Sequence, residues 1–421
     1  VTFAPCPENI FPDHINEYFE RSQQVCPKLE AICGKWEFED LIPGLSDFDT
    51  RFIFSDDVTS EEWPEISRAI GQVHTDICIE KPDRARILEH LPGINLTWKE
   101  ALEPASFYPE FKQWTMYHAP EDKKASFETY LKERSWDDIE ELFNIKKFAL
   151  YFTPYDRSID PAINLHEFES KYPLHSRIMH YFCPPLQSAV NIRLKRMIRG
   201  KIESFRLARD LFPNPQVIDE LLDILGHHYE VPDYYREPKL SEFETMLFEY
   251  LKNVLRVIQP EITVIDASPE DSLKELKVKL GRVSVGVWNR FFDGAKFCRL
   301  MMGRLNFYAE EIPHFDSFWL IENEIKRIRK LFFETTFSAF GQIMWGVEMN
   351  ADEALERCRN QYISEQEYAA VKAYASVFGK PYDTITIKRY ACEIAHTMGP
   401  FQIVLDKLTP LVHQKMSENY T

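Results

Sequence analysis

The sequence predicts an α+β N-terminal region with a short mixed β-sheet, followed by a mainly α-helical C-terminal region. Strand and helix patterns alternate around the segment Gly44–Phe54, whereas helical periodicity dominates from about Glu167 onward. A chain of 421 residues is also too long for one ordinary hydrophobic core. We therefore expect an N-terminal domain over residues 1–165 and a helical region of one or two domains over residues 166–421.

The predicted sheet begins with two strands and has two candidates for the third. Leu29–Gly34 is a short apolar strand that ends in glycine, and Gly44–Phe54 is a loop that turns into a second strand. Val73–Glu80 alternates between two faces, so we expect the third strand there, after a helix over Ser60–Gln72. A competing alignment places the third strand at Ile94–Trp98.

The second strand carries two carboxylates at positions i and i+2. Because side chains alternate along a strand, Asp47 and Asp49 should project from one face while Phe48 points to the packed side. Two acids held side by side repel each other, and a divalent cation removes that cost. Mg²⁺ is the expected ion, since it binds carboxylate oxygens and shares its other positions with water and substrate phosphates.

The residues ahead of the aspartates give this segment a recognisable spacing. Gly34 and Lys35 are followed by eleven residues and then by Asp47-Phe48-Asp49. This arrangement resembles the nucleotidyltransferase superfamily related to DNA polymerase β, and the run Gly44–Asp49 is similar to that of small-molecule members. The family usually has Ser or Gly where this chain has Lys35. A lysine there either supplies a point charge to the phosphates or indicates an altered pocket.

The resemblance implies a fold, a reaction and a set of site residues. It implies a nucleotidyltransferase domain in which two Mg²⁺ ions serve the transfer of a nucleoside monophosphate from a nucleoside triphosphate, such as ATP, to an acceptor hydroxyl, with release of pyrophosphate. Asp47 and Asp49 would be metal ligands, and Asp76 the third carboxylate and candidate base. Gly34, Lys35 and Ser46 would bind the phosphates.

The competing alignment leads to a different function. If the third strand is Ile94–Trp98, it carries Asn95 and Thr97 and offers no acid. The chain would then be a degenerate nucleotidyltransferase-fold protein that binds a ligand or partner without chemistry.

One of the expected helices has a basic face. Lys195, Arg199, Arg206 and Arg209 cluster beside its apolar side, either as a solvated flank or as cations that meet the triphosphate. On the second interpretation, Lys195 and Arg199 bind the nucleotide. One last strand is expected over Lys147–Thr153. The expected helices after the sheet are Ser135–Phe143, the basic helix Ala189–Phe212, Glu242–Val257, Ser272–Glu310, Phe318–Gly346 and Glu365–Phe378.

The composition of the chain limits the classes of partner that we expect. A net charge of −17 argues against wrapping of nucleic acid, whose affinity depends on phosphate neutralisation, and favours a small-molecule or protein acceptor. No apolar run approaches the roughly 20 residues that span a bilayer, so no membrane association is expected. The eight cysteines are scattered without a C-x-x-C pair, which is typical of reduced thiols in a cytoplasmic protein.

Overall fold

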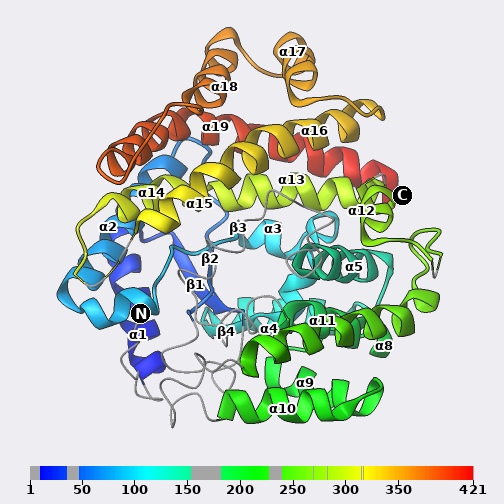
Figure 1. Ribbon diagram of the computed structural model, residues 1–421. Helices are drawn as coiled ribbons and strands as arrows, with labels where there is room; N and C mark the ends of the chain where they lie inside the picture. Colours follow the sequence, from blue (N-terminus) through cyan, green and yellow to red (C-terminus); the bar gives the residue numbers. More distant parts are fainter. Residues whose placement is uncertain are drawn as a thin grey trace.

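The fold is seen in a computed structural model that describes residues 10–35, 47–152, 182–226, 239–268, 270–281, 283–313, 315 and 317–420 (Figure 1). Ser46 and the expected domain boundary at residue 165 lie outside the described residues. No helix in these ranges is long and apolar enough to cross a membrane.

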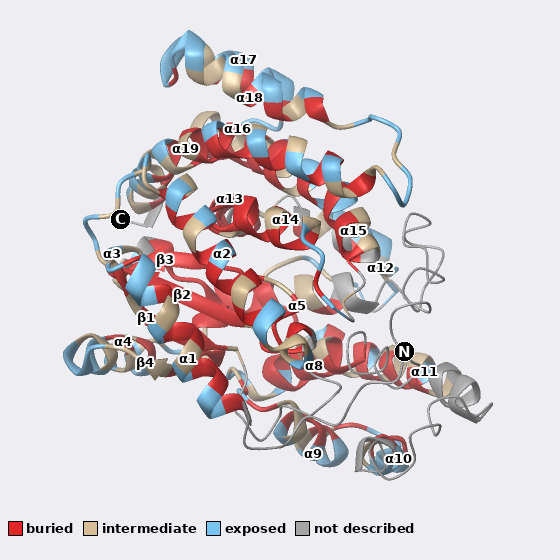
Figure 2. Ribbon diagram, turned by 90° about the vertical axis from the view of Figure 1, so that its left-hand side faces the viewer, coloured by how far each residue is buried: buried red, intermediate tan, exposed pale blue. Residues whose placement is uncertain are grey.

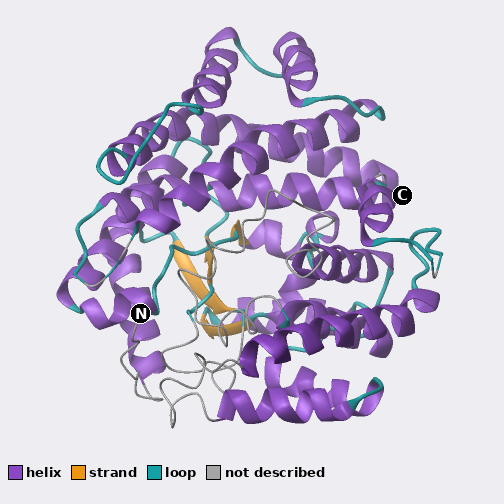
Figure 3. Cartoon of the chain, viewed as in Figure 1, coloured by secondary structure: helices purple, strands orange, loops and turns teal. Residues whose placement is uncertain are grey.

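The sheet of the described chain has four strands in the order β3-β2-β1-β4. β1 pairs antiparallel with both β2 and β4, and β2 pairs parallel with β3, so the sheet is mixed as expected. It is enclosed by helices (Figure 3), and every residue of β2 is buried, which is typical of a sheet covered on both faces. The strands are β1 Leu29–Gly34, β2 Thr50–Phe54, β3 Asn95–Thr97 and β4 Thr115–His118.

Helices make up most of the rest of the described structure. Those before residue 226 are α1 Ile10–Val25, α2 Trp63–Glu80, α3 Trp98–Leu102, α4 Glu121–Glu133, α5 Asp138–Phe152, α8 Cys183–Leu194, α9 Lys201–Leu211 and α10 Pro215–Gly226. The later ones are α11 Lys239–Ile258, α12 Leu273–Gly281, α13 Ser284–Cys298, α14 Met301–Ala309, α15 Phe318–Ile328, a π-helix Arg329–Thr335, α16 Thr336–Trp345, α17 Ala351–Gln361, α18 Glu365–Val377 and α19 Ile387–Tyr420. The mainly helical C-terminal region is thereby confirmed.

The hydrophobic core is divided in a way that does not follow the order of the chain. One cluster joins the sheet and α1–α4 to helices α13–α19 at the C-terminal end. A second cluster lies within α5 and α8–α12, which occupy the right-hand side and the bottom of Figure 1. Figure 2 shows both as buried interiors beneath exposed helix faces. The C-terminal helices therefore complete the core that supports the sheet.

Buried charges fasten these distant segments together. Arg299, after α13, donates two hydrogen bonds to Glu100 of α3, at 2.6 and 2.8 Å, and another to Asp406 of α19 at 3.0 Å. Lys296 also contacts Glu100. Burial alone would raise the pKa of Glu100, but Arg299 and Lys296 outweigh that effect and hold the pKa well below its usual range.

Four sequence predictions of secondary structure are wrong. The single helix expected at Ser272–Glu310 is divided into α12, α13 and α14. Residues 73–80 are not a strand, because α2 continues to Glu80 with Ile66, Ile70, Val73 and Ile77 buried at helical spacing. The strand expected at Lys147–Thr153 is instead the end of α5, which reaches Phe152.

The helix expected at Ala189–Phe212 is divided into two. Lys195 has a φ of 51° and caps α8 in the left-handed region, and the chain starts a new helix, α9, only at Lys201. The competing third strand is confirmed, since β3 occupies Asn95–Thr97 beside β2.

A direct backbone contact joins α2 to α14, and we expect Gly303→Ala to disrupt it. A Cβ on Gly303 would lie 2.0 Å from the backbone oxygen of Ser67, so the helices would have to separate. The backbone amide of Gly303 also donates to Ser67 Oγ at 2.9 Å. Overpacking of this kind should lower the free energy of unfolding by about 1–3 kcal/mol or more, measured by chemical denaturation.

Gly399→Ala in α19 is the matched control. Its Cβ would have no neighbour closer than 3.6 Å outside the adjacent residues. Alanine is favoured over glycine in a helix interior by roughly 0.5–1 kcal/mol, whereas a Cβ ahead of Pro400 opposes that gain. Gly399→Ala should therefore change the free energy of unfolding much less than Gly303→Ala. Equal effects of the two substitutions would contradict the close helix crossing.

Candidate active site

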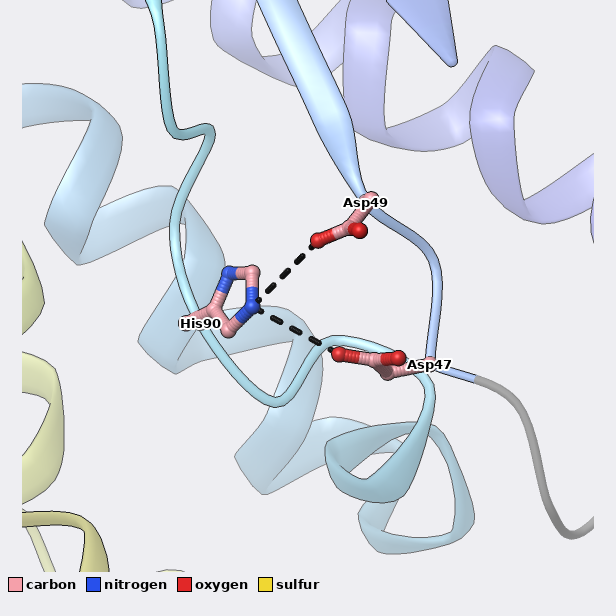
Figure 4. A group of neighbouring side chains, drawn as sticks. All are labelled: Asp47, Asp49 and His90. Atoms are coloured by element: carbon pink, nitrogen blue, oxygen red, sulfur yellow. Dashed lines mark ion pairs between the residues drawn. The ribbon is translucent and has the colours of Figure 1, made fainter. Parts of the chain in front are cut away.

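The two aspartates lie at the entrance to β2, where the sheet fixes their direction. The Lys35 amide, just after β1, donates to the Asp49 carbonyl at 3.1 Å, and the Phe48 amide donates to the Ile87 carbonyl at 2.9 Å. Phe48 is buried against Phe11 and Tyr117. Phe48 packs inward, whereas the side chains of Asp47 and Asp49 both point toward His90, in agreement with the predicted alternation (Figure 4).

A histidine that sequence reasoning missed completes the group. His90 Nε2 lies 3.5 Å from Asp47 Oδ2 and 3.5 Å from Asp49 Oδ1. One ligand atom from each of the three residues falls within 4.8 Å of the others, and all three side chains are partly buried. His90 lies in the segment between α2 and β3. Because β3 pairs with β2, a correct prediction of β3 would have placed the residues before it close to the aspartates.

The arrangement of His90 suits a metal ligand. Its Nδ1 lies 3.2 Å from the Leu91 carbonyl, and donation of the Nδ1 proton to that oxygen would leave the Nε2 lone pair facing the carboxylates. Two carboxylates and one imidazole form a mixed oxygen and nitrogen donor set. Mn²⁺ accepts such a set, whereas Mg²⁺ prefers oxygen ligands throughout. The residues therefore fit a divalent cation, with Mn²⁺ better matched than Mg²⁺.

Lysines from three separate elements surround the acidic group. Lys35 Nζ lies 3.8 Å from Asp49 Oδ2. Burial and the nearby Lys35 charge lower the pKa of Lys147, in α5, to about 7, although Glu110 and Asp49 act in the opposite direction. Lys201, the first residue of α9, has a pKa lowered by burial, against the raising effect of Cys183 and of both aspartates. Electrostatic interaction therefore links all three lysines to the aspartates.

A buried ion pair between Arg51 and Glu110 lies near the aspartates and the lysines. Arg51 of β2 donates from Nε to Glu110 Oε1 at 3.1 Å, and its Nη2 lies 2.9 Å from the same oxygen. Burial would raise the pKa of Glu110, but Arg51, Lys35 and Lys147 together lower it to about 2. The charge of Glu110 therefore persists and offsets part of the positive charge of the lysines.

Asp76 lies on α2, and no contact brings it to the acidic pair. Gln72 Nε2 donates to Asp76 Oδ1 at 2.8 Å, one turn earlier on the helix. Within the described ranges, the only group of three potential metal ligands contains His90 in place of Asp76. The prediction of Asp76 as a third carboxylate on a neighbouring strand depended on the wrong secondary structure. The true neighbouring strand carries Asn95 and Thr97.

The predicted nucleotide-binding residues occupy different parts of the fold. Gly34 ends β1 where a Cβ would lie 2.5 Å from the Tyr117 ring, so glycine is required by packing. Lys195 pairs with Glu141 at 2.7 Å, and Arg199 Nε donates to the Lys112 carbonyl at 3.3 Å. The expected helix is broken between residues 194 and 201. Lys195 and Arg199 lie in this break and line a hollow together with residues from the end of α4 and the segment after it.

Comparison with known proteins finds no matching family model, no matching curated protein and no matching solved structure.

The lowered pKa of Lys147 predicts a pH-dependent effect of Lys147→Met. The unfolded chain keeps this lysine charged to about pH 10.4, whereas the folded protein releases the proton near pH 7. The cost of burying the charge is therefore fully present below pH 7 and is lost as the pH rises from about 7 to about 10.4. Lys147→Met should stabilise the protein most at about pH 6, and progressively less at higher pH, in denaturation series. A pH-independent difference would contradict this burial.

Proposed function

We propose that this chain is a metal-dependent nucleotidyltransferase that uses a nucleoside triphosphate and a small-molecule or protein acceptor. The observation that supports it best is the convergence of Asp47, Asp49 and His90, each offering a ligand atom within 4.8 Å of the others, at the start of a sheet strand. The resemblance of the Gly34-Lys35 and Asp47-Phe48-Asp49 spacing supplies the reaction class.

The charges around the group favour a triphosphate bound together with a cation. Without an ion, the two carboxylates repel an incoming phosphate; with one, they attract it through the metal. Lys35, which follows β1, and Lys201, the first residue of α9, supply positive charge, and Lys147 of α5 adds to it when it is protonated. In a chain with a net charge of −17, this local concentration of lysines is suited to a small anionic substrate.

The proposed reaction forms one bond and breaks one bond. An acceptor hydroxyl oxygen attacks the α-phosphorus and loses its proton to solvent, and the bond from that phosphorus to the bridging oxygen of pyrophosphate breaks in line. A cation held by Asp47, Asp49 and His90 would supply charge neutralisation for the triphosphate. Lys35, Lys147 and Lys201 would orient the phosphate oxygens and stabilise the charge of the departing pyrophosphate.

A binding function without chemistry is the second candidate, and a specific observation favours it. β3, the strand beside β2, carries Asn95 and Thr97, where the resemblance calls for an acid. Asn95 is buried, and its amide donates to the carbonyls of Pro92 and Gly93. A chain that binds a nucleotide and metal but lacks a base would retain affinity and show no turnover.

Asp47→Asn tests the proposal because it removes one negative charge while preserving the size of the side chain. Binding of a nucleoside triphosphate in the presence of Mn²⁺ should weaken strongly, and pyrophosphate release with a competent acceptor should fall by at least ~10²-fold, the scale expected for loss of a preorganised electrostatic group. Calorimetric titration with Mn²⁺ or Mg²⁺, each repeated in EDTA, measures binding separately from turnover.

Asp76→Asn is the matched control, since it removes the same charge from α2 outside the group. It should leave both binding and turnover close to those of the unmodified protein. Retained metal-dependent binding in Asp47→Asn would show that Asp47 is not a ligand. Metal-dependent binding by the unmodified protein without turnover on any acceptor would support the binding function instead.

A further inference from the structure

A second polar hollow lies away from the acidic group. It has a volume of about 650 Å³ and is formed by the end of α4, the segment that follows it, the 3₁₀ turn Pro109–Gln113 and the connection between α8 and α9. Glu128 is the only acidic residue in its lining. The basic residues that line it are Lys112, Lys132, Arg134, Lys195, Arg196 and Arg199.

Half of this positive charge is not balanced by described carboxylates. Lys112 pairs with Glu140, Arg134 with Asp137 and Lys195 with Glu141. Over the ranges that the structure describes, Lys132, Arg196 and Arg199 form no ion pair, and all three are exposed. Three cations without acidic partners around one hollow, on a protein of net charge −17, predict an anionic ligand.

The connection that presents two of these cations is held firmly. The Ile198 carbonyl accepts hydrogen bonds from Gln113 Nε2 at 3.1 Å and from Gln187 Nε2 at 3.0 Å. The Ile198 amide donates to Asn191 Oδ1 at 2.8 Å. Because Ile198 is buried between Arg196 and Arg199, these bonds fix the backbone on which the two arginines stand.

Part of the lining is apolar and aromatic. Leu131 is buried, and Trp136 and Met197 are partly exposed within the same hollow. Lys195 Nζ lies 5.7 Å from the centre of the Trp136 ring. An indole and a thioether beside a cationic rim suit a ligand with a flat ring at one end and phosphates at the other.

We propose that this hollow is a second ligand site for a nucleotide, whose phosphates contact Lys132, Arg196 and Arg199 and whose ring packs on Trp136. Its lining residues include none of Asp47, Asp49 or His90, and its cations bind phosphate without a metal. The proposal therefore does not depend on the proposed catalytic function.

The test is a calorimetric titration of the full chain with ATP in EDTA, where the acidic group lacks a cation and repels the triphosphate. The unmodified protein should bind ATP, and Arg196→Ala and Arg199→Ala should each weaken it about tenfold or more through loss of a charge-assisted contact. Arg206→Ala is the matched control, because Arg206 is exposed on α9 outside the hollow and should have little effect. Equal weakening by all three variants, or no ATP binding in EDTA, would overturn the proposal.

Two further probes test the two ends of the ligand. Tripolyphosphate should bind more weakly than ATP, and Trp136→Leu should remove that difference while leaving tripolyphosphate affinity unchanged. Equal affinities for ATP and tripolyphosphate in the unmodified protein would overturn the assignment of the ring to Trp136. Much tighter binding of a single-stranded oligonucleotide, lost in Arg196→Ala, would overturn the assignment to a nucleotide in favour of nucleic acid. Because the measurement excludes metal, its failure is distinguishable from failure of the catalytic proposal.

Discussion

The repulsion between Asp47 and Asp49 is the constraint on which the site depends. The pairing of β1 with β2 and the burial of Phe48 favour the placement of both carboxylates on one side, beside His90. The fold offsets this cost with positive charge and a polar nitrogen brought from elsewhere. Lys35 follows β1, and His90 comes from the segment before β3. An ion between the carboxylates would complete the balance.

The site is stabilised by segments far away in the chain. A sheet with strands of three to six residues is too small to bury its own faces, and the C-terminal helices supply much of the missing core. Arg299 fastens this assembly by bridging Glu100 and Asp406, which lie more than 300 residues apart. Helices α5 and α9, whose apolar residues form part of the second core, carry Lys147 and Lys201, which interact electrostatically with the aspartates. The residues around the acidic pair thus come from elements of both cores.

The local elements of the site could be predicted from the sequence, whereas its third partner could not. β1, the strand after Asp49 and the shared face of the aspartates follow from alternation and glycine placement. Residues 73–80 satisfy strand alternation and helical spacing at once, and only packing against α14 and α1 selects the helix. Because residues 73–80 were predicted as a strand, Asp76 was assigned to the site and His90 was overlooked. His90 belongs to no sequence motif that would have indicated its role.

The prediction of one continuous basic helix over Ala189–Phe212 was wrong for a related reason. Helical periodicity continued across residues 195–200, and although Gly200 indicates a possible break, no residue near position 195 indicated that Lys195 would adopt a left-handed conformation. Hydrogen bonds between the Ile198 backbone and the side-chain amides of Gln113, Gln187 and Asn191 favour the break; Gln187 and Asn191 lie on α8, and Gln113 lies in the 3₁₀ turn Pro109–Gln113. The break separates Lys201, beside the aspartates, from Arg196 and Arg199 in the second hollow. The hydrogen bond from Gln113, which lies 85 residues before Ile198, leaves no local pattern in the sequence.

The most direct test of the central claim is a crystal structure of the full chain grown with Mn²⁺ and a non-hydrolysable nucleoside triphosphate, with the ion located by its anomalous scattering. The account predicts an anomalous peak bonded to Asp47, Asp49 and His90 Nε2, with triphosphate oxygens completing its coordination and Lys35, Lys147 and Lys201 directed at the phosphates. A nucleotide bound without a peak between the two aspartates, or a peak held by other residues, would contradict the account.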